Sequence, residues 1–201
     1  MRLRGLHPGV ILCLVLLASL HAETVVFLGD SITAGRGLEP EQAYPALVGA
    51  RLPAAWKTVN AGVSGDTSAG GLRRLDWVLK AKPDLVVIAL GGNDGLRGLP
   101  VAELERNLRP IVGKVRAAGA RAALIGMRMP ANLGPDYRAA FDAVYPRLAS
   151  ELALPLLPFL LDGLALEPRY NQPDLVHPNA AGQELIATRV ATWLTPLLAG
   201  P

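Results

Sequence analysis

The chain has 201 residues, of which 51% are hydrophobic, 18% charged and 5% aromatic, and its formal net charge is +3. This composition fits a folded globular protein and excludes a disordered chain. The length fits one domain that buries a core without the help of a disulfide or a metal. A single cysteine, Cys13, excludes an internal disulfide and a zinc or redox site of the Cys-x-x-Cys type.

The first 22 residues have the pattern of a secretory signal peptide. Arg2 and Arg4 precede an apolar run over residues 10–20, and Ala22 is a small residue at which cleavage can occur. The run is shorter than the roughly 20 apolar residues that a membrane span needs. Leu20 is larger than the residue usual three positions before cleavage, so retention as an anchor stays open as the alternative. We therefore expect a signal peptide over 1–22 and one folded domain over 23–201.

Removal of this segment changes what the composition implies. The net charge falls to +1, both Cys13 and two of the three histidines are lost, and His177 is the histidine that remains. A cysteine nucleophile and a histidine-cluster metal site are then excluded, and no metal or cofactor is expected. No run of basic residues with interleaved aromatics points to nucleic acid. We expect a periplasmic or secreted monomer with no stable membrane insertion after cleavage.

Strand-like and helix-like segments alternate along the rest of the chain. Alternation of this kind predicts a three-layer α/β/α sandwich around a mainly parallel sheet of about five strands. Two prolines, Pro155 and Pro158, place the last strand at a sheet edge. The strands are expected over residues 24–30, 56–60, 84–90, 121–129 and 154–161. The helices are expected over residues 42–52, 67–80, 101–118, 137–151 and 180–197.

Ligands of such sheets bind beyond the carboxyl ends of the strands, which directs attention to the loops at residues 29–38, 61–71, 91–99 and 171–179. In the first loop, Ser31 directly follows a buried strand and can be presented at the start of a helix, although a plain helix cap is the favoured interpretation of this loop taken alone. In the last loop, Asp174 precedes His177 by three positions. A serine nucleophile needs such a base and an acceptor that orients it.

The two middle loops are rich in hydrogen-bond donors. Residues 62–67 are glycine-rich and open a helix, and Asn93 offers a side-chain amide directly after the strand over 84–90. Donors that converge on one point can form an oxyanion hole. Phosphate binding is a weaker interpretation because the chain has neither a GxxxxGK[ST] nor a GxGxxG motif. Plain tight turns remain the alternative for each loop taken alone.

Taken together, the four loops resemble the SGNH, or GDSL-like, hydrolase superfamily. The shared blocks are Gly-Asp-Ser (29–31), Gly65, Gly-x-Asn-Asp (91–94) and Asp-x-x-His (174–177). Further stretches, VSGDTS (63–68), GGNDGLRG (91–98), LPFL (157–160) and HPN (177–179), resemble its secreted bacterial thioesterases, lysophospholipases and arylesterases. The resemblance spans residues 23–197, and Ile32 replaces the leucine of the family name.

The resemblance implies the flavodoxin-like fold of that superfamily and a role for each matching residue. Ser31 would be the nucleophile, His177 the general base and then acid, and Asp174 the residue that orients His177. The backbone N–H groups of Ser31 and Gly65 and the amide of Asn93 would bind the oxyanion, without metal or cofactor. The partners would be small-molecule acyl esters or thioesters.

Substrate contacts are expected in the loops near the strand ends, while Met127 is expected in the core. A carbohydrate or short-chain acetyl esterase of the same superfamily is one alternative function. A non-catalytic lipid- or glycan-binding module is another. The candidate substrate-binding residues are Leu96, Arg97, Leu99, Pro130 and Leu133.

Overall fold

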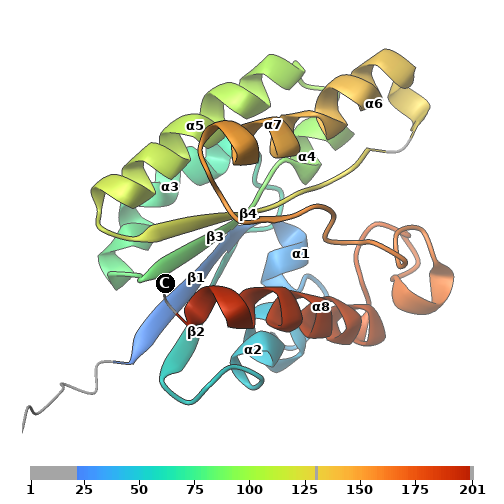
Figure 1. Ribbon diagram of the computed structural model, residues 1–201. Helices are drawn as coiled ribbons and strands as arrows, with labels where there is room; N and C mark the ends of the chain where they lie inside the picture. Colours follow the sequence, from blue (N-terminus) through green and yellow to red (C-terminus); the bar gives the residue numbers. More distant parts are fainter. Residues whose placement is uncertain (1–21, 130, 200–201) are drawn as a thin grey trace, which may run out of the picture.

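The computed structural model describes residues 22–129 and 131–199 and shows a five-stranded parallel sheet between two layers of helices (Figure 1). The strand order is β2-β1-β3-β4-β5, and every neighbouring pair is parallel. The predicted sandwich is therefore confirmed. The strands are β1 (Glu23–Gly29), β2 (Trp56–Gly62), β3 (Leu85–Ala89), β4 (Arg121–Ile125) and β5 (Leu156–Leu157).

Helices cover both faces of the sheet. Figure 1 shows α3, α5 and α7 on one face and α2 and α8 on the other, which explains why the central strands read as continuous apolar runs. The α-helices are α1 (Ser31–Ala34), α2 (Tyr44–Gly49), α3 (Ser68–Val78), α4 (Gly92–Leu96), α5 (Val101–Ala117), α6 (Pro135–Asp142), α7 (Val144–Glu151) and α8 (Ala180–Leu198). The 3₁₀ turns are η1 (Pro40–Gln42), η2 (Leu79–Ala81), η3 (Ala131–Leu133) and η4 (Pro168–Tyr170).

Prolines explain two differences from the predicted elements. The edge strand β5 is confined to two residues, because neither Pro155 nor Pro158 can donate a ladder hydrogen bond. The helix expected over residues 137–151 is two helices, α6 and α7, and Pro146 lies in the first turn of α7. Proline lacks the N–H that would continue a single helix through Asp142. The predicted helix over residues 42–52 is shortened to α2, and its first residue, Gln42, belongs to the preceding turn η1.

The carboxyl ends of the three neighbouring strands β2, β1 and β3 lie level with one another. Gly29 is paired with Gly62 on one side and with Ala89 on the other. The loops that follow these strands therefore leave the sheet side by side, at the edge where open α/β folds bind ligands.

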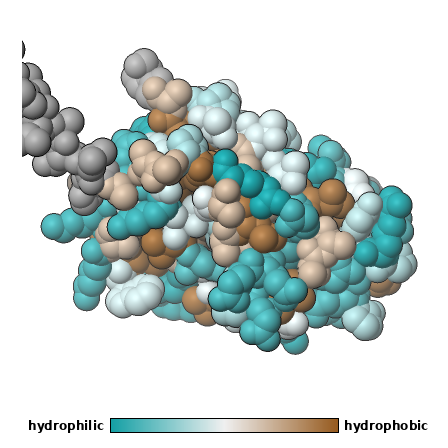
Figure 2. Space-filling model, turned by 90° about the horizontal axis from the view of Figure 1, so that it is seen from below, coloured by the Kyte–Doolittle hydropathy of each residue, from teal (hydrophilic) through white to brown (hydrophobic). Residues whose placement is uncertain are grey.

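The face below the sheet is mostly polar. Figure 2 views the molecule from this side and shows hydrophilic residues with hydrophobic ones scattered among them. Within the described residues, no helix has the length and apolar character needed to cross a membrane.

Candidate active site

Ser31 is the first residue of α1 and lies at the carboxyl end of β1. Asp30 caps this short helix, since its Oδ1 accepts the backbone N–H of Ile32 at 3.0 Å. The Ser31 residue is buried, with an exposed fraction of 7%. The chain thus leaves a central strand and enters a helix within two residues, which fixes the serine at the end of the sheet.

His177 and Asp174 lie in the loop before α8. An antiparallel bridge between Asn171 and Pro178 closes this loop, and the N–H of Gln172 donates to the carbonyl of His177 at 2.8 Å. Asn179 then caps α8, as its position in the sequence predicts. The loop is therefore held at both ends.

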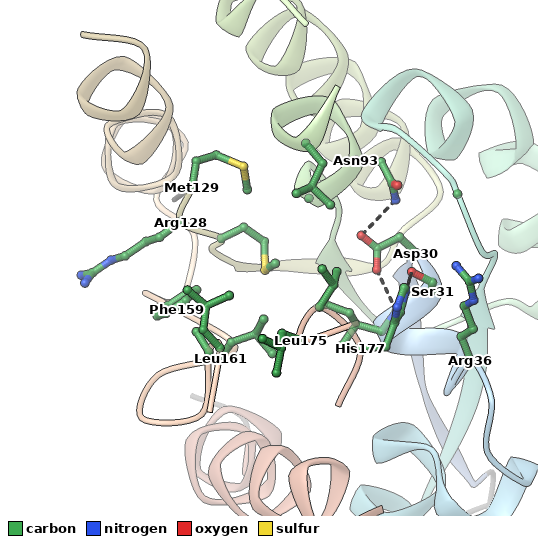
Figure 3. A pocket seen from close by; sticks show the side chains of 18 of the residues that line it. Asp30, Ser31, Arg36, Asn93, Arg128, Met129, Phe159, Leu161, Leu175 and His177 are labelled. Atoms are coloured by element: carbon green, nitrogen blue, oxygen red, sulfur yellow. Dashed lines mark hydrogen bonds between the residues drawn. The ribbon is translucent and has the colours of Figure 1, made fainter. Parts of the chain in front are cut away.

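The three side chains form one chain of hydrogen bonds. The Nε2 atom of His177 lies 2.9 Å from Oγ of Ser31 (Figure 3). The Nδ1 atom of His177 lies 2.6 Å from Oδ2 of Asp174. With the proton on Nδ1 facing the carboxylate, Nε2 is free to accept the serine proton. This is the geometry of a nucleophile, its base and the group that orients the base.

Asp174 is held as a carboxylate. Its Oδ1 accepts the backbone N–H groups of Val176 at 3.0 Å and His177 at 2.9 Å. The N–H of His177, then its ring and the N–H of Val176, lower the pKa of Asp174 to about 2. The turn places Leu175 in the left-handed region at φ 58°, a conformation that costs a leucine about 1–2 kcal/mol. Sequence spacing does not reveal this strain.

The candidate oxyanion donors surround Ser31 on the adjacent loops. Gly65, at φ +84°, and Asn93, in the first turn of α4, line the same cavity as Ser31. Among the described residues, neither the Ser31 nor the Gly65 backbone N–H donates to an acceptor. The amide of Asn93 donates to the carbonyl of Asp66 at 2.9 Å and lies 3.4 Å from Oδ2 of Asp30 (Figure 3).

Asp30 is a further carboxyl beside the serine and, unlike the exposed Asp174, it is buried, with an exposed fraction of 5%. Burial raises its pKa to about 6, against the opposing effects of the Ile32 N–H and of nearby His177. Asp30 belongs to the Gly-Asp-Ser block at residues 29–31, but that pattern assigns it no role. Its place directly after a buried strand is the sequence signal that points to it.

A cavity of about 530 Å³ opens next to these groups. Figure 3 shows Ser31, His177 and Arg36 at one end and Arg128, Met129, Phe159 and Leu161 at the other. Met127, expected in the core, is buried and also lines the cavity. Most of the wall between the polar end and the far end is apolar.

The candidate substrate-binding residues are placed differently from one another. Leu96 lines the cavity, whereas Arg97, Leu99 and Leu133 are not part of its wall. The Arg97 guanidinium instead donates to the carbonyl of Gly65 at 2.7 Å, and the carbonyl of Leu99 accepts the Tyr137 hydroxyl at 2.8 Å. Pro130 lies outside the described residues. Arg36, beside Ser31, lines the cavity but is not among the substrate-binding residues expected from the sequence.

The chain is similar to known proteins over most of its length. Residues 27–185 match the GDSL-like Lipase/Acylhydrolase family. The chain is 43% identical to "Thioesterase 1/protease 1/lysophospholipase L1" of Escherichia coli K12, covering 95% of this chain and 92% of that protein. It is 44% identical to "Esterase TesA" of Pseudomonas aeruginosa, covering 98% and 100%.

A solved structure is similar over the same span. The crystal structure of the psychrotrophic esterase EstA from Pseudoalteromonas sp., inhibited by monoethylphosphonate, superposes with a TM-score of 0.83 at 35% identity, covering 89% of this chain and 100% of that one. In the described residues, no group of three or more His, Cys, Asp or Glu side chains is arranged to hold a metal ion. The chain belongs to the GDSL-like lipase/acylhydrolase family.

Proposed function

We propose that this protein is a serine hydrolase that cleaves carboxylic esters and thioesters through an acyl-enzyme on Ser31. The observation that carries the proposal is the hydrogen-bonded series Ser31–His177–Asp174 at the polar end of an apolar cavity. Relatives named as thioesterase, lysophospholipase and esterase support the same reaction class.

The reaction takes two steps at these atoms. Ser31 Oγ attacks the substrate carbonyl while Nε2 of His177 accepts its proton, and Asp174 stabilises the resulting imidazolium. The N–H groups of Ser31 and Gly65 and the amide of Asn93 hold the oxyanion. His177 then protonates the leaving alcohol or thiol, and a water deprotonated by His177 releases the acid and frees Ser31.

The cavity supports an acyl chain longer than acetyl. Its far wall is formed by Met129, Phe159 and Leu161, which an acetyl group bound at Ser31 would leave largely without contact. We propose medium or long acyl groups as the preferred substrates. An acyl-chain series of p-nitrophenyl esters and acyl-CoA thioesters tests this, and a preference limited to acetyl would favour the carbohydrate-esterase alternative.

Replacement of Ser31 tests the reaction itself. We expect Ser31→Ala to lower hydrolysis by about 10⁴-fold or more with an unchanged circular dichroism spectrum, because no other group supplies the nucleophile. A fluorophosphonate probe should label the unmodified protein and not the variant. Normal turnover by Ser31→Ala would refute the assignment, and an unlabelled, inactive wild-type protein would favour a non-catalytic binding module.

We further propose that residues 1–22 act as a cleaved export signal and that the enzyme works in the periplasm or outside the cell. Support comes from the basic and apolar pattern of this segment and from β1, which begins directly after it at Glu23.

A further inference from the structure

Arg74 of α3 joins two loops of the site although it does not line the cavity. Its Nε donates to Oδ2 of Asp66 at 2.5 Å, and its Nη2 donates to the carbonyl of Gly29 at 2.9 Å. Both charged side chains are largely buried, with exposed fractions of 19% for Arg74 and 15% for Asp66. The guanidinium is therefore held between the end of β1 and the loop after β2.

Each of the two residues that Arg74 contacts lies one or two positions along the chain from a proposed oxyanion donor. Gly29 precedes Ser31 by two positions, and its carbonyl also accepts the N–H of Val63 at 3.0 Å. Asp66 follows Gly65, and its own carbonyl accepts the amide of Asn93 at 2.9 Å. Arg74 thus contacts the segments that carry two of the donors, and the third donor, Asn93, bonds to the residue Asp66 that Arg74 holds.

The chemistry of arginine suits this task better than that of lysine. A planar guanidinium presents several N–H groups in fixed directions, whereas an ammonium group is a single point charge on a flexible stem. The remaining nitrogen, Nη1, is buried without a hydrogen-bond partner in the described part of the chain. An unsatisfied buried donor is costly, so stability alone does not favour this residue.

The loop that Arg74 holds also packs against a second residue of α3, Gly70. A Cβ added at Gly70 would lie 2.4 Å from Oδ1 of Asp66, so α3 packs directly against this carboxylate. Arg97 binds the carbonyl of Gly65 from the solvent side. The position of Gly65 and Asn93 relative to Ser31 therefore depends on Asp66, and the position of Asp66 depends on Arg74.

We propose that Arg74 is a positioning residue that fixes the relative placement of the three oxyanion donors. The inference rests on the proposed function, because it assigns Arg74 to the oxyanion site of that reaction. Its effect should appear in the rate of the chemical step and not in substrate affinity, since donors aimed at the oxyanion act mainly in the transition state.

Three single variants separate the effect of the two simultaneous contacts of Arg74 from the effect of its charge and from that of changing a surface arginine. We expect Arg74→Gln to lower kcat by about 10- to 100-fold with KM within about twofold, the size expected for a weakened oxyanion donor. Arg74→Lys keeps the charge beside Asp66 but cannot also reach Gly29 in the same geometry, so its kcat should fall as well. Arg73→Gln alters the neighbouring exposed arginine and should leave kcat unchanged. Circular dichroism and thermal unfolding report whether each variant folds.

A double-mutant cycle with Asn93→Ala gives the decisive measurement. If Arg74 positions Asn93 together with the two backbone donors, Arg74→Gln should cost less in kcat in the Asn93→Ala background than in the unmodified protein. Unchanged kcat in a folded Arg74→Lys protein, or a full and additive loss in the Asn93→Ala background, would overturn the proposal. Ser31→Ala tests the proposed function independently, because retained activity there would refute the nucleophile whatever Arg74 does.

Discussion

Asp30 brings a buried carboxyl to the side of Ser31, and its titration should be visible in the stability of the protein. Burial raises its pKa to about 6 from an ordinary value of 3.8. Between these two values the native protein binds the proton more tightly than the unfolded chain does. The contribution of Asp30 to the free energy of unfolding is therefore greatest in acid and is lost as the pH rises through about 6, a change of about 3 kcal/mol.

Asp30→Asn isolates this contribution because asparagine does not titrate and its side-chain oxygen can still accept the N–H of Ile32. We expect the free energy of unfolding of the unmodified protein, relative to the variant, to increase by about 2–3 kcal/mol between pH 7 and pH 4. Urea unfolding at both pH values measures it. The pKa of Asp174 is lowered to about 2, so its protonation in acid lowers the free energy of unfolding. This change has the opposite sign, but it is the same in both proteins and cancels in the comparison. A difference that does not vary with pH would contradict the prediction.

The residues found from the sequence and those missed differ in a physical way. Asp174 and His177 lie three positions apart, so one turn is enough to join them. In the structure Oδ2 of Asp174 lies 2.6 Å from Nδ1 of His177. The contacts of Arg74 with Gly29 and Asp66 depend on how α3 packs over the sheet, which local sequence does not encode. Leu99 and Leu133 lie in the right loops, but loop membership does not fix which way a side chain points.

The approach of α1 to β2 sets the position of Ser31 at the scale of whole elements. A Cβ added at Gly62 would lie 2.3 Å from the backbone nitrogen of Ala34, so the helix that begins at Ser31 rests directly on the strand. Backbone atoms cannot move aside as a flexible side chain can. We expect Gly62→Ala to destabilise the fold by about 1–3 kcal/mol and to lower kcat, because α1 must shift.

Gly113→Ala in α5 is the matched control for this substitution. Nothing lies within 4 Å of a Cβ at this exposed helical glycine. Alanine there should raise the free energy of unfolding by about 0.5–1 kcal/mol and leave kcat unchanged. Urea unfolding and ester hydrolysis compare the two. If Gly62→Ala were as stable and as active as Gly113→Ala, close contact between α1 and β2 would not position the serine.

Elements with a strong periodic signal were predicted well, whereas the edge strand β5 and the region of α6 and α7 were not. The strand expected over residues 84–90 and the helix expected over residues 101–118 agree with β3 and α5 to within a residue or two. The edge strand and the α6–α7 break depend on single missing N–H groups at Pro155, Pro158 and Pro146. Apolar periodicity carries no information about such missing donors, so it overestimates the length of these elements.

At the scale of the whole molecule, strand β1 begins at Glu23, directly after the proposed signal. The first described hydrogen bond of β1 runs from the N–H of Glu23 to the carbonyl of Ala55 at 2.8 Å, and residues 24–28 are buried in the centre of the sheet. β1 is paired on both sides, with β2 and with β3. Cleavage after Ala22 would thus spare every strand pairing, whereas cleavage a few residues later would remove part of the central strand.

A chain that starts at Glu23 should therefore behave as the complete enzyme. We expect its unfolding midpoint to lie within about 2 °C of that of the full-length protein, since a change of 1 kcal/mol would already shift the midpoint by about 2–4 °C. Its kcat should be the same, because in the part of the chain that the structure describes the groups that contact Ser31 and His177 lie after residue 22. Sequencing of the exported protein should read from Glu23. Full-length protein retained in the membrane fraction would instead identify residues 1–22 as an anchor, and a large loss of stability in the shortened chain would show that β1 depends on the preceding segment.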